Sequence, residues 1–116
     1  MKIAKHKGIA VVAPSGWLMG GPETDDFEKT IRELLESGNR CLVIDLMECN
    51  HMNSIALGKL IGMHTSYANR GGRMKLCNLD KKIQNVLVIT KLSLVFDVYQ
   101  SEREAMASFA GTECPG

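Results

Sequence analysis

The chain has 116 residues, of which 45% are hydrophobic and 23% are charged, a composition typical of a single globular domain with one core. Its 14 Lys and Arg residues nearly balance 13 Asp and Glu residues, so the net charge is +1 and the strong positive field that attracts nucleic acid is absent. No apolar run approaches the roughly 20 residues of a membrane span, and Pro14 and Gly16 break the N-terminal stretch too early for a secretory signal. We therefore expect a cytoplasmic protein with neither nucleic acid nor a membrane as partner.

The first part of the chain predicts two strands and a helix. Residues 9–13 are rich in β-branched side chains and end at Pro14, and residues 2–6 are placed to pair with them as a short edge strand. Residues 23–36 begin with acidic side chains and end before Gly38, which predicts a helix. Its apolar positions recur at helical spacing: Phe27, Ile31, Leu34 and Leu35.

The middle of the chain predicts a central strand followed by a long helix. Residues 41–46 form an apolar run interrupted only by Asp45, which is typical of a strand covered on both faces. The next helix is expected over residues 54–69, with Ser54 at its start and the pair Gly71 and Gly72 after its end.

The C-terminal part predicts two more strands and two more helices. A short strand is expected around Cys77, and Asp80 is expected to cap a third helix. Residues 96–99 predict the last strand, and Ser101 with Glu104 fits a capping box that opens the last helix.

This alternation of strands and helices predicts an α/β fold. We expect a mixed sheet of four to five strands with about four helices packed against it, because parallel strands are joined by helices and the two N-terminal strands are close enough for a hairpin. The domain is expected over residues 1–110, with a frayed tail over residues 111–116. The irregularly spaced cysteines are expected to be free thiols: Cys41, Cys49, Cys77 and Cys114.

No catalytic motif is visible, which indicates a binding protein rather than an enzyme. Residues 19–22 contain two glycines but lack the lysine and the glycine spacing of a phosphate-binding loop, so a plain turn is favoured. Cys49 and His51 supply two ligands rather than four, so a loop thiol and a loop histidine are preferred to a metal or thiolate site. His64 is interpreted as a core or boundary residue, and we expect neither metal nor cofactor.

Residues 45–61, DLMECNHMNSIALGKLI, place the Ser54 hydroxyl where a loop meets the beginning of a helix. The simplest interpretation is a helix cap, since a serine that accepts a backbone N–H at this position is worth about 1 kcal/mol. Composition alone favours this structural role.

Several segments, taken in order, resemble STAS domains, a family named for sulfate transporters and anti-sigma factor antagonists. In bacterial antagonists of that family a strand ends in an Asp-Leu-like pair, and after a spacer Asp-Ser-[Ser/Thr]-Gly-Leu-Gly opens a helix. The matching segments here are Asp45-Leu46 and Asn53-Ser54-Ile55-Ala56-Leu57-Gly58. Residues 71–76 look like the family's helix-to-strand turn, and residues 89–92 with Phe96 resemble its "TGL…F" segment.

The resemblance implies a STAS fold and a switch at Ser54. In the family, the serine at this position is phosphorylated by an anti-sigma factor that is also a protein kinase, and only the unphosphorylated antagonist binds the anti-sigma factor. Such a switch is physically reasonable, because a phosphate adds about −1.5 to −2 charges beside a helix N-terminus, which tolerates an anion.

The chain departs from the family pattern at three positions. Asn53 replaces the usual Asp, Ile55 replaces a small hydroxyl residue, and Ala56 replaces Gly. Asn53 can still cap the helix but carries no charge for a kinase to contact, and Ile55 adds an apolar side chain to a possible docking surface.

We therefore expect a regulatory module that docks an anti-sigma factor, or a serine kinase of the anti-sigma type, and is phosphorylated at Ser54. The alternative is a phosphorylation-independent scaffold or homodimer in which Ile55 makes an apolar contact. A third possibility, a nucleotide or small-ligand site, is supported only by the glycine turn and the helix start. The residues expected to bind the partner are Gly20, Gly21, Asn53, Ser54, Ile55, Ala56 and Leu57.

Overall fold

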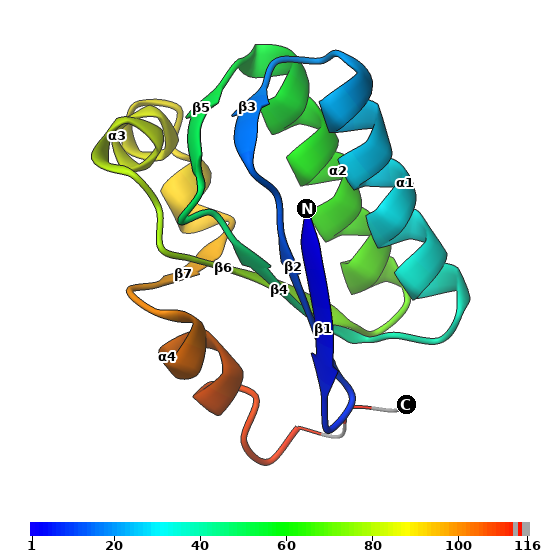
Figure 1. Cartoon of the computed structure of the whole chain (residues 1–116). Coiled ribbons are helices and arrows are strands. Elements are labelled where there is room, and N and C mark those ends of the chain that lie inside the picture. Colours follow the sequence, from blue (N-terminus) through cyan, green and yellow to red (C-terminus); the bar gives the residue numbers. More distant parts are fainter. Residues whose placement is uncertain (113, 115–116) are drawn as a thin grey trace.

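A mixed five-stranded sheet forms the centre of the computed structural model, which describes residues 1–112 and 114 (Figure 1). The strand order is β1-β2-β4-β6-β7, and only the β1–β2 pair is antiparallel. The α/β class, the N-terminal hairpin and the central strand are thus as predicted. The bounds are β1 (Lys2–His6), β2 (Ile9–Ala13), β4 (Cys41–Asp45), β6 (Arg73–Cys77) and β7 (Asp97–Tyr99).

Helices cover both faces of this sheet. The long helices α1 (Pro22–Glu36) and α2 (Ser54–Asn69) lie side by side, and α4 (Glu102–Ala107) packs on the other side (Figure 1). The helix α3 (Lys81–Ile89) adds apolar side chains to the same core as α1 and α2 and is followed by a short 3₁₀ helix, Leu92–Leu94.

The central strand β4 shows why its sequence is apolar throughout. Leu42 and Ile44 point into the larger core beneath α1 and α2, whereas Cys41 and Val43 point into the smaller core beneath α4. Both faces of the strand are therefore buried, and the usual alternation of apolar and polar residues is lost.

The predicted caps of the last two helices are present. The Asp80 carboxylate accepts a hydrogen bond from the Lys82 amide at 2.8 Å, and the Ser101 hydroxyl accepts one from the Glu104 amide at 3.1 Å. The capping box is displaced by one residue, because the Glu104 carboxylate accepts from the Gln100 amide at 3.3 Å and not from the amide of Ser101.

A second, two-stranded parallel sheet was not predicted. It pairs β3 (Gly16–Leu18) with β5 (Cys49–Met52) and lies beyond the end of the main sheet, near the start of α2 (Figure 1). Leu18 and Cys49 are buried in the larger core. These strands have only three and four residues, too few to establish a period-two pattern in the sequence.

Gly20 shapes the turn that follows β3. Its φ is +87°, and its amide donates to the Thr24 hydroxyl at 2.9 Å. A Cβ at this position would lie 2.8 Å from Cγ2 of Ile55, so a larger residue would need the Ile55 side chain to shift as well as a left-handed backbone. The expectation of a turn at residues 19–22 is consistent with this geometry.

The free-thiol prediction is wrong for two of the four cysteines. Cys41 is joined to Cys114 by a disulfide across a sequence separation of 73 residues, while Cys49 and Cys77 are free and buried. The irregular spacing gave no sign of this pair, because the two residues meet only when β4 and the C-terminal segment are both in place. The predicted frayed tail lies partly outside the described residues, at positions 113, 115 and 116.

The disulfide predicts a thiol count and a stability change. Protein purified without reductant should titrate two thiols after denaturation, and four after reduction. Closing a loop of 73 residues is expected to stabilise the fold by about 4 kcal/mol, so Cys114→Ser should lower the urea midpoint and should abolish the effect of reductant. Four thiols without reduction would contradict the assignment.

Gly20→Ala should lower the free energy of unfolding by about 2 kcal/mol, because the alanine must adopt a left-handed φ and its Cβ meets Ile55. Gly58→Ala on α2 is the matched control. Its Cβ would meet nothing within 4 Å, so it should stabilise the helix by about 1 kcal/mol. Urea denaturation measures both variants, and equal effects would show that the close approach at Gly20 is not needed.

Candidate functional site

The two-stranded sheet brings the Gly20 turn and the start of α2 into one surface. Register pairs Trp17 with His51 and Leu18 with Met52, so the residues that follow each strand also lie together. The Asn53 amide donates to the Leu18 carbonyl at 3.2 Å, and the Asn53 side-chain Nδ2 donates to the Met19 carbonyl at 2.8 Å. Two segments 34 residues apart are thereby held as a unit.

Asn53, and not Ser54, is the N-cap of α2. The backbone of Asn53 is extended, and its Oδ1 accepts the Ala56 amide at 3.1 Å. The interpretation of Ser54 as a cap is therefore wrong, because the Asn53 side chain already accepts the Ala56 amide and is also bonded to Met19. Ser54 is the first helical residue, is exposed, and its hydroxyl makes no hydrogen bond with the described residues.

Five of the seven expected partner-binding residues meet at this surface. Gly20 and Gly21 end the β3 turn, Asn53 and Ser54 begin α2, and Ile55 is 55% exposed and lies against Gly20.

The other two residues of the predicted set face inward. Ala56 and Leu57 are only 4% and 8% exposed and pack in the larger core. The third and fourth positions of this helix point toward the sheet, so they support the surface and leave little of their own area for a partner.

The beginnings of two helices lie close together here, but their charges differ. Gly21 caps α1, whose first turn carries Glu23 and Asp25, whereas the first turn of α2 contains no acidic residue. The positive end of the α2 dipole beside Ser54 is therefore not offset within its own helix.

An ion-pair cluster fixes α1 against α2 just behind this surface. Lys59 contacts Glu28 at 3.0 Å and Asp25 at 3.5 Å. The hydrogen bond from Lys59 lowers the pKa of the Glu28 carboxyl, which strengthens the pairing at neutral pH.

Sequence reasoning missed an exposed aromatic residue next to the site. Trp17 is 65% exposed and its ring lies 5.5 Å from that of His51, while Met19 is also exposed. The signal was present: the single tryptophan of the chain lies in a short segment between glycines, where a core position is not expected.

Asp45, which begins the family-like segment, positions the chain that leads to β5. Its carboxylate accepts the Met47 amide at 2.9 Å and the Asn78 side-chain amide at 3.1 Å. The pKa of Glu102 is raised by a hydrogen bond with Asp45, by burial and by the Asp45 charge. The bonds that Asp45 accepts from Met47 and Asn78 hold the end of β4, and this residue is buried and not part of the exposed surface.

The Cys49 and His51 pair does not form a reactive centre. Cys49 lies on β5 and not in a loop, it is fully buried, and burial raises the pKa of its thiol. His51 is on the same strand but exposed. Residues 1–112 and 114 contain no group of three or more side chains suited to hold a metal ion.

His64 is a boundary residue, as expected. It is half-buried on α2, and its ring lies edge-on to Phe96 with 5.3 Å between centroids.

In the described part of the chain no helix is long and apolar enough to span a bilayer.

Comparison with known proteins identifies the family. The family model of the STAS domain matches residues 1–105. The anti-sigma F factor antagonist of Paenibacillus polymyxa is 23% identical over 108 residues, which cover 91% of each chain. The fold is similar to the crystal structure of a Thermotoga maritima protein, with a TM-score of 0.86, 22% identity and 92% of each chain covered. It is also similar to the Bacillus cell fate determinant SpoIIAA in its phosphorylated form, with a TM-score of 0.73 and 16% identity over 92% of this chain and 96% of the other. The resemblance to STAS domains is thus confirmed, and the chain belongs to the STAS domain family.

Proposed function

We propose that this protein is a cytoplasmic anti-sigma factor antagonist whose binding to an anti-sigma factor is switched by phosphorylation of Ser54. It acts as a binding module and a kinase substrate, not as an enzyme. The observation that carries the proposal is the Ser54 hydroxyl, which is exposed at the first turn of α2 and is not engaged in capping.

The start of α2 can accept a phosphate without refolding. Backbone N–H groups at a helix N-terminus and the helix dipole favour an anion, and no acidic residue of the first turn opposes it. The cap made by Asn53 does not depend on Ser54, so modification of the hydroxyl leaves the hydrogen bond to Ala56 in place. The phosphorylated domain is therefore expected to stay folded.

Phosphorylation of Ser54 is expected to change partner binding because the phosphate would lie within an apolar surface. Ile55, Trp17 and Met19 are exposed on either side of the Gly20 turn. A group carrying about −1.5 to −2 charges must be desolvated if a partner covers these side chains, and that cost opposes docking.

The second candidate is a scaffold that does not use phosphorylation. It is favoured by the exposed Ile55 side chain and by the absence of a carboxylate at Asn53. In this case the same surface binds a partner or a second copy of the chain through apolar contacts alone.

Phosphorylation is tested with the anti-sigma-type serine kinases of the source organism and ATP. Mass spectrometry should locate the phosphate on Ser54, and Ser54→Ala should abolish it. Ser93→Ala, at an exposed serine in the 3₁₀ helix Leu92–Leu94, should be phosphorylated like the wild type. Phosphate elsewhere, or on Ser54→Ala, would remove the proposal.

Binding of the same kinases then separates the two candidates. Ser54→Asp should weaken binding by tenfold or more, since a fixed charge replaces the neutral hydroxyl. The scaffold candidate predicts instead that Ser54→Asp binds normally and that only Ile55→Asp disrupts the complex. Calorimetry with purified kinase measures both variants.

A further inference from the structure

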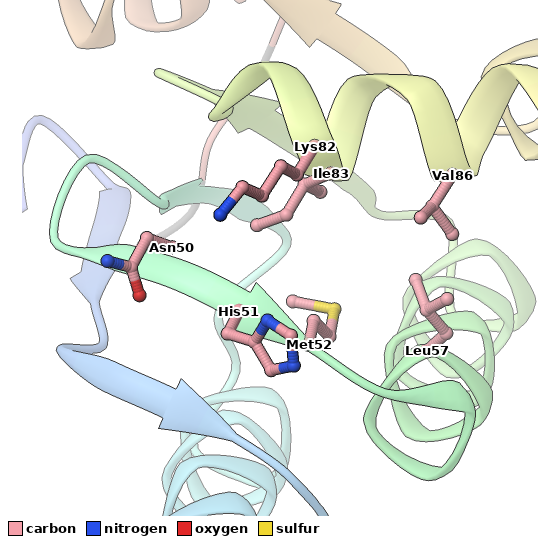
Figure 2. Close-up of a pocket in the computed structure, with 7 residues that line it drawn as sticks. All are labelled: Asn50, His51, Met52, Leu57, Lys82, Ile83 and Val86. Carbon is pink, nitrogen blue, oxygen red and sulfur yellow. The ribbon is translucent and has the colours of Figure 1, made fainter.

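A small groove opens beside the proposed docking surface. It lies between β5, the first turn of α2 and the helix α3 (Figure 2). Val86 and Leu57 point toward one another at one end, and the Lys82 side chain extends from α3 toward β5 at the other (Figure 2). The residues lining it are Asn50, His51, Met52, Leu57, Lys82, Ile83 and Val86.

The size of the groove decides what it can hold. Its volume is about 90 Å³, whereas pockets for drug-sized molecules and cofactors occupy roughly 300–1,000 Å³. A cofactor or a drug-sized molecule is therefore too large, and the groove matches one aliphatic side chain projecting from another protein.

The lining fits such a side chain together with an acidic neighbour. Ile83 and Leu57 form an apolar base, and Val86 is 36% exposed at the edge. Lys82 is the only charged residue in the lining, and no carboxylate among the described residues forms an ion pair with it. A carboxylate beside the inserted side chain would thus meet an unpaired cation.

The groove continues into the surface around Ser54. Leu57 lines it and follows Ser54 by three residues, so the two positions are neighbours on α2. His51 lines it and also contacts the exposed Trp17 ring. One partner covering Ser54 and the Trp17 ring would therefore also reach the mouth of the groove.

We propose that this groove is the anchor site of the partner protein and takes one Leu, Ile, Val or Met side chain next to an Asp or Glu that pairs with Lys82. The inference rests on the proposed function in one respect, namely that the occupant is the regulatory partner. It does not require Ser54 to be phosphorylated.

A random 12-residue peptide library displayed on phage, selected on the wild-type protein, provides the probe. The enriched peptides should share an aliphatic residue with Asp or Glu one or two positions away. Val86→Phe, which fills the mouth, and Lys82→Glu, which reverses the charge, should each weaken their binding at least tenfold. Two neighbours on α3 give matched controls, because Val88→Phe and Lys81→Glu change exposed residues outside the groove and should bind like the wild type.

Three outcomes would overturn the inference. These are enriched peptides without the aliphatic–acidic pair, peptides that bind the groove variants and the controls equally, and a dimer that Val86→Phe disrupts, which would make a second copy the occupant. The proposal of the groove and the proposal of the Ser54 switch can be disproved independently. If the kinase phosphorylates Ser54 but binds Val86→Phe and Lys82→Glu normally, the switch stands and the groove fails. Peptides that use the groove without any phosphorylation of Ser54 give the reverse result.

Discussion

The amide side chain of Asn53 makes the contact on which the exposed surface depends. Its Nδ2 donates to the Met19 carbonyl at 2.8 Å, while its Oδ1 accepts the Ala56 amide at 3.1 Å. One residue therefore fixes the β3 turn and begins α2 at the same time. An aspartate, the usual family residue here, can make the second bond but has no proton to donate to Met19 at neutral pH. Asn53 thus lacks the surface charge of an aspartate, but it links the β3 turn to the start of α2.

The consequences of this link extend to Ser54, Ile55 and the groove. Because Asn53 caps the helix, the Ser54 hydroxyl is left free for chemistry. Because the turn is held against α2, Gly20 packs on Ile55 and keeps that side chain at the surface. The parallel pairing of β3 with β5 aligns Trp17 with His51, and His51 in turn forms part of the groove. A modification at Ser54 and a partner anchored in the groove would therefore act on one rigid surface, with no conformational change needed to connect them.

The sequence predicts the elements of the main sheet well because their patterns are strong. The apolar run of residues 41–46 and the helical spacing of residues 54–69, followed by two glycines, match β4 and α2 closely. The local sequence pattern does not predict features that depend on contacts between distant segments. Asn53 and Ser54 are both good capping residues, and the bonds from Asn53 to Leu18 and Met19 place the first at the cap. The short strands β3 and β5 and the Cys41–Cys114 disulfide likewise depend on distant segments meeting in the fold.

Hydrogen exchange of the Gly20 and Ala56 amides measures the Asn53 link most directly. Replacing Asn53 with Ala removes the acceptor of the Ala56 amide and frees the Met19 carbonyl, which loosens the turn that holds the Gly20 amide on Thr24. Exchange at the two amides should therefore accelerate together by about tenfold, or ~1.4 kcal/mol. Amides in β4, such as that of Leu42, should keep their rates. Asn50→Ala, an exposed asparagine on β5, is the matched control and should change neither site. Acceleration at Ala56 with an unchanged Gly20 would show that Asn53 is only a helix cap and that the turn is held by other contacts.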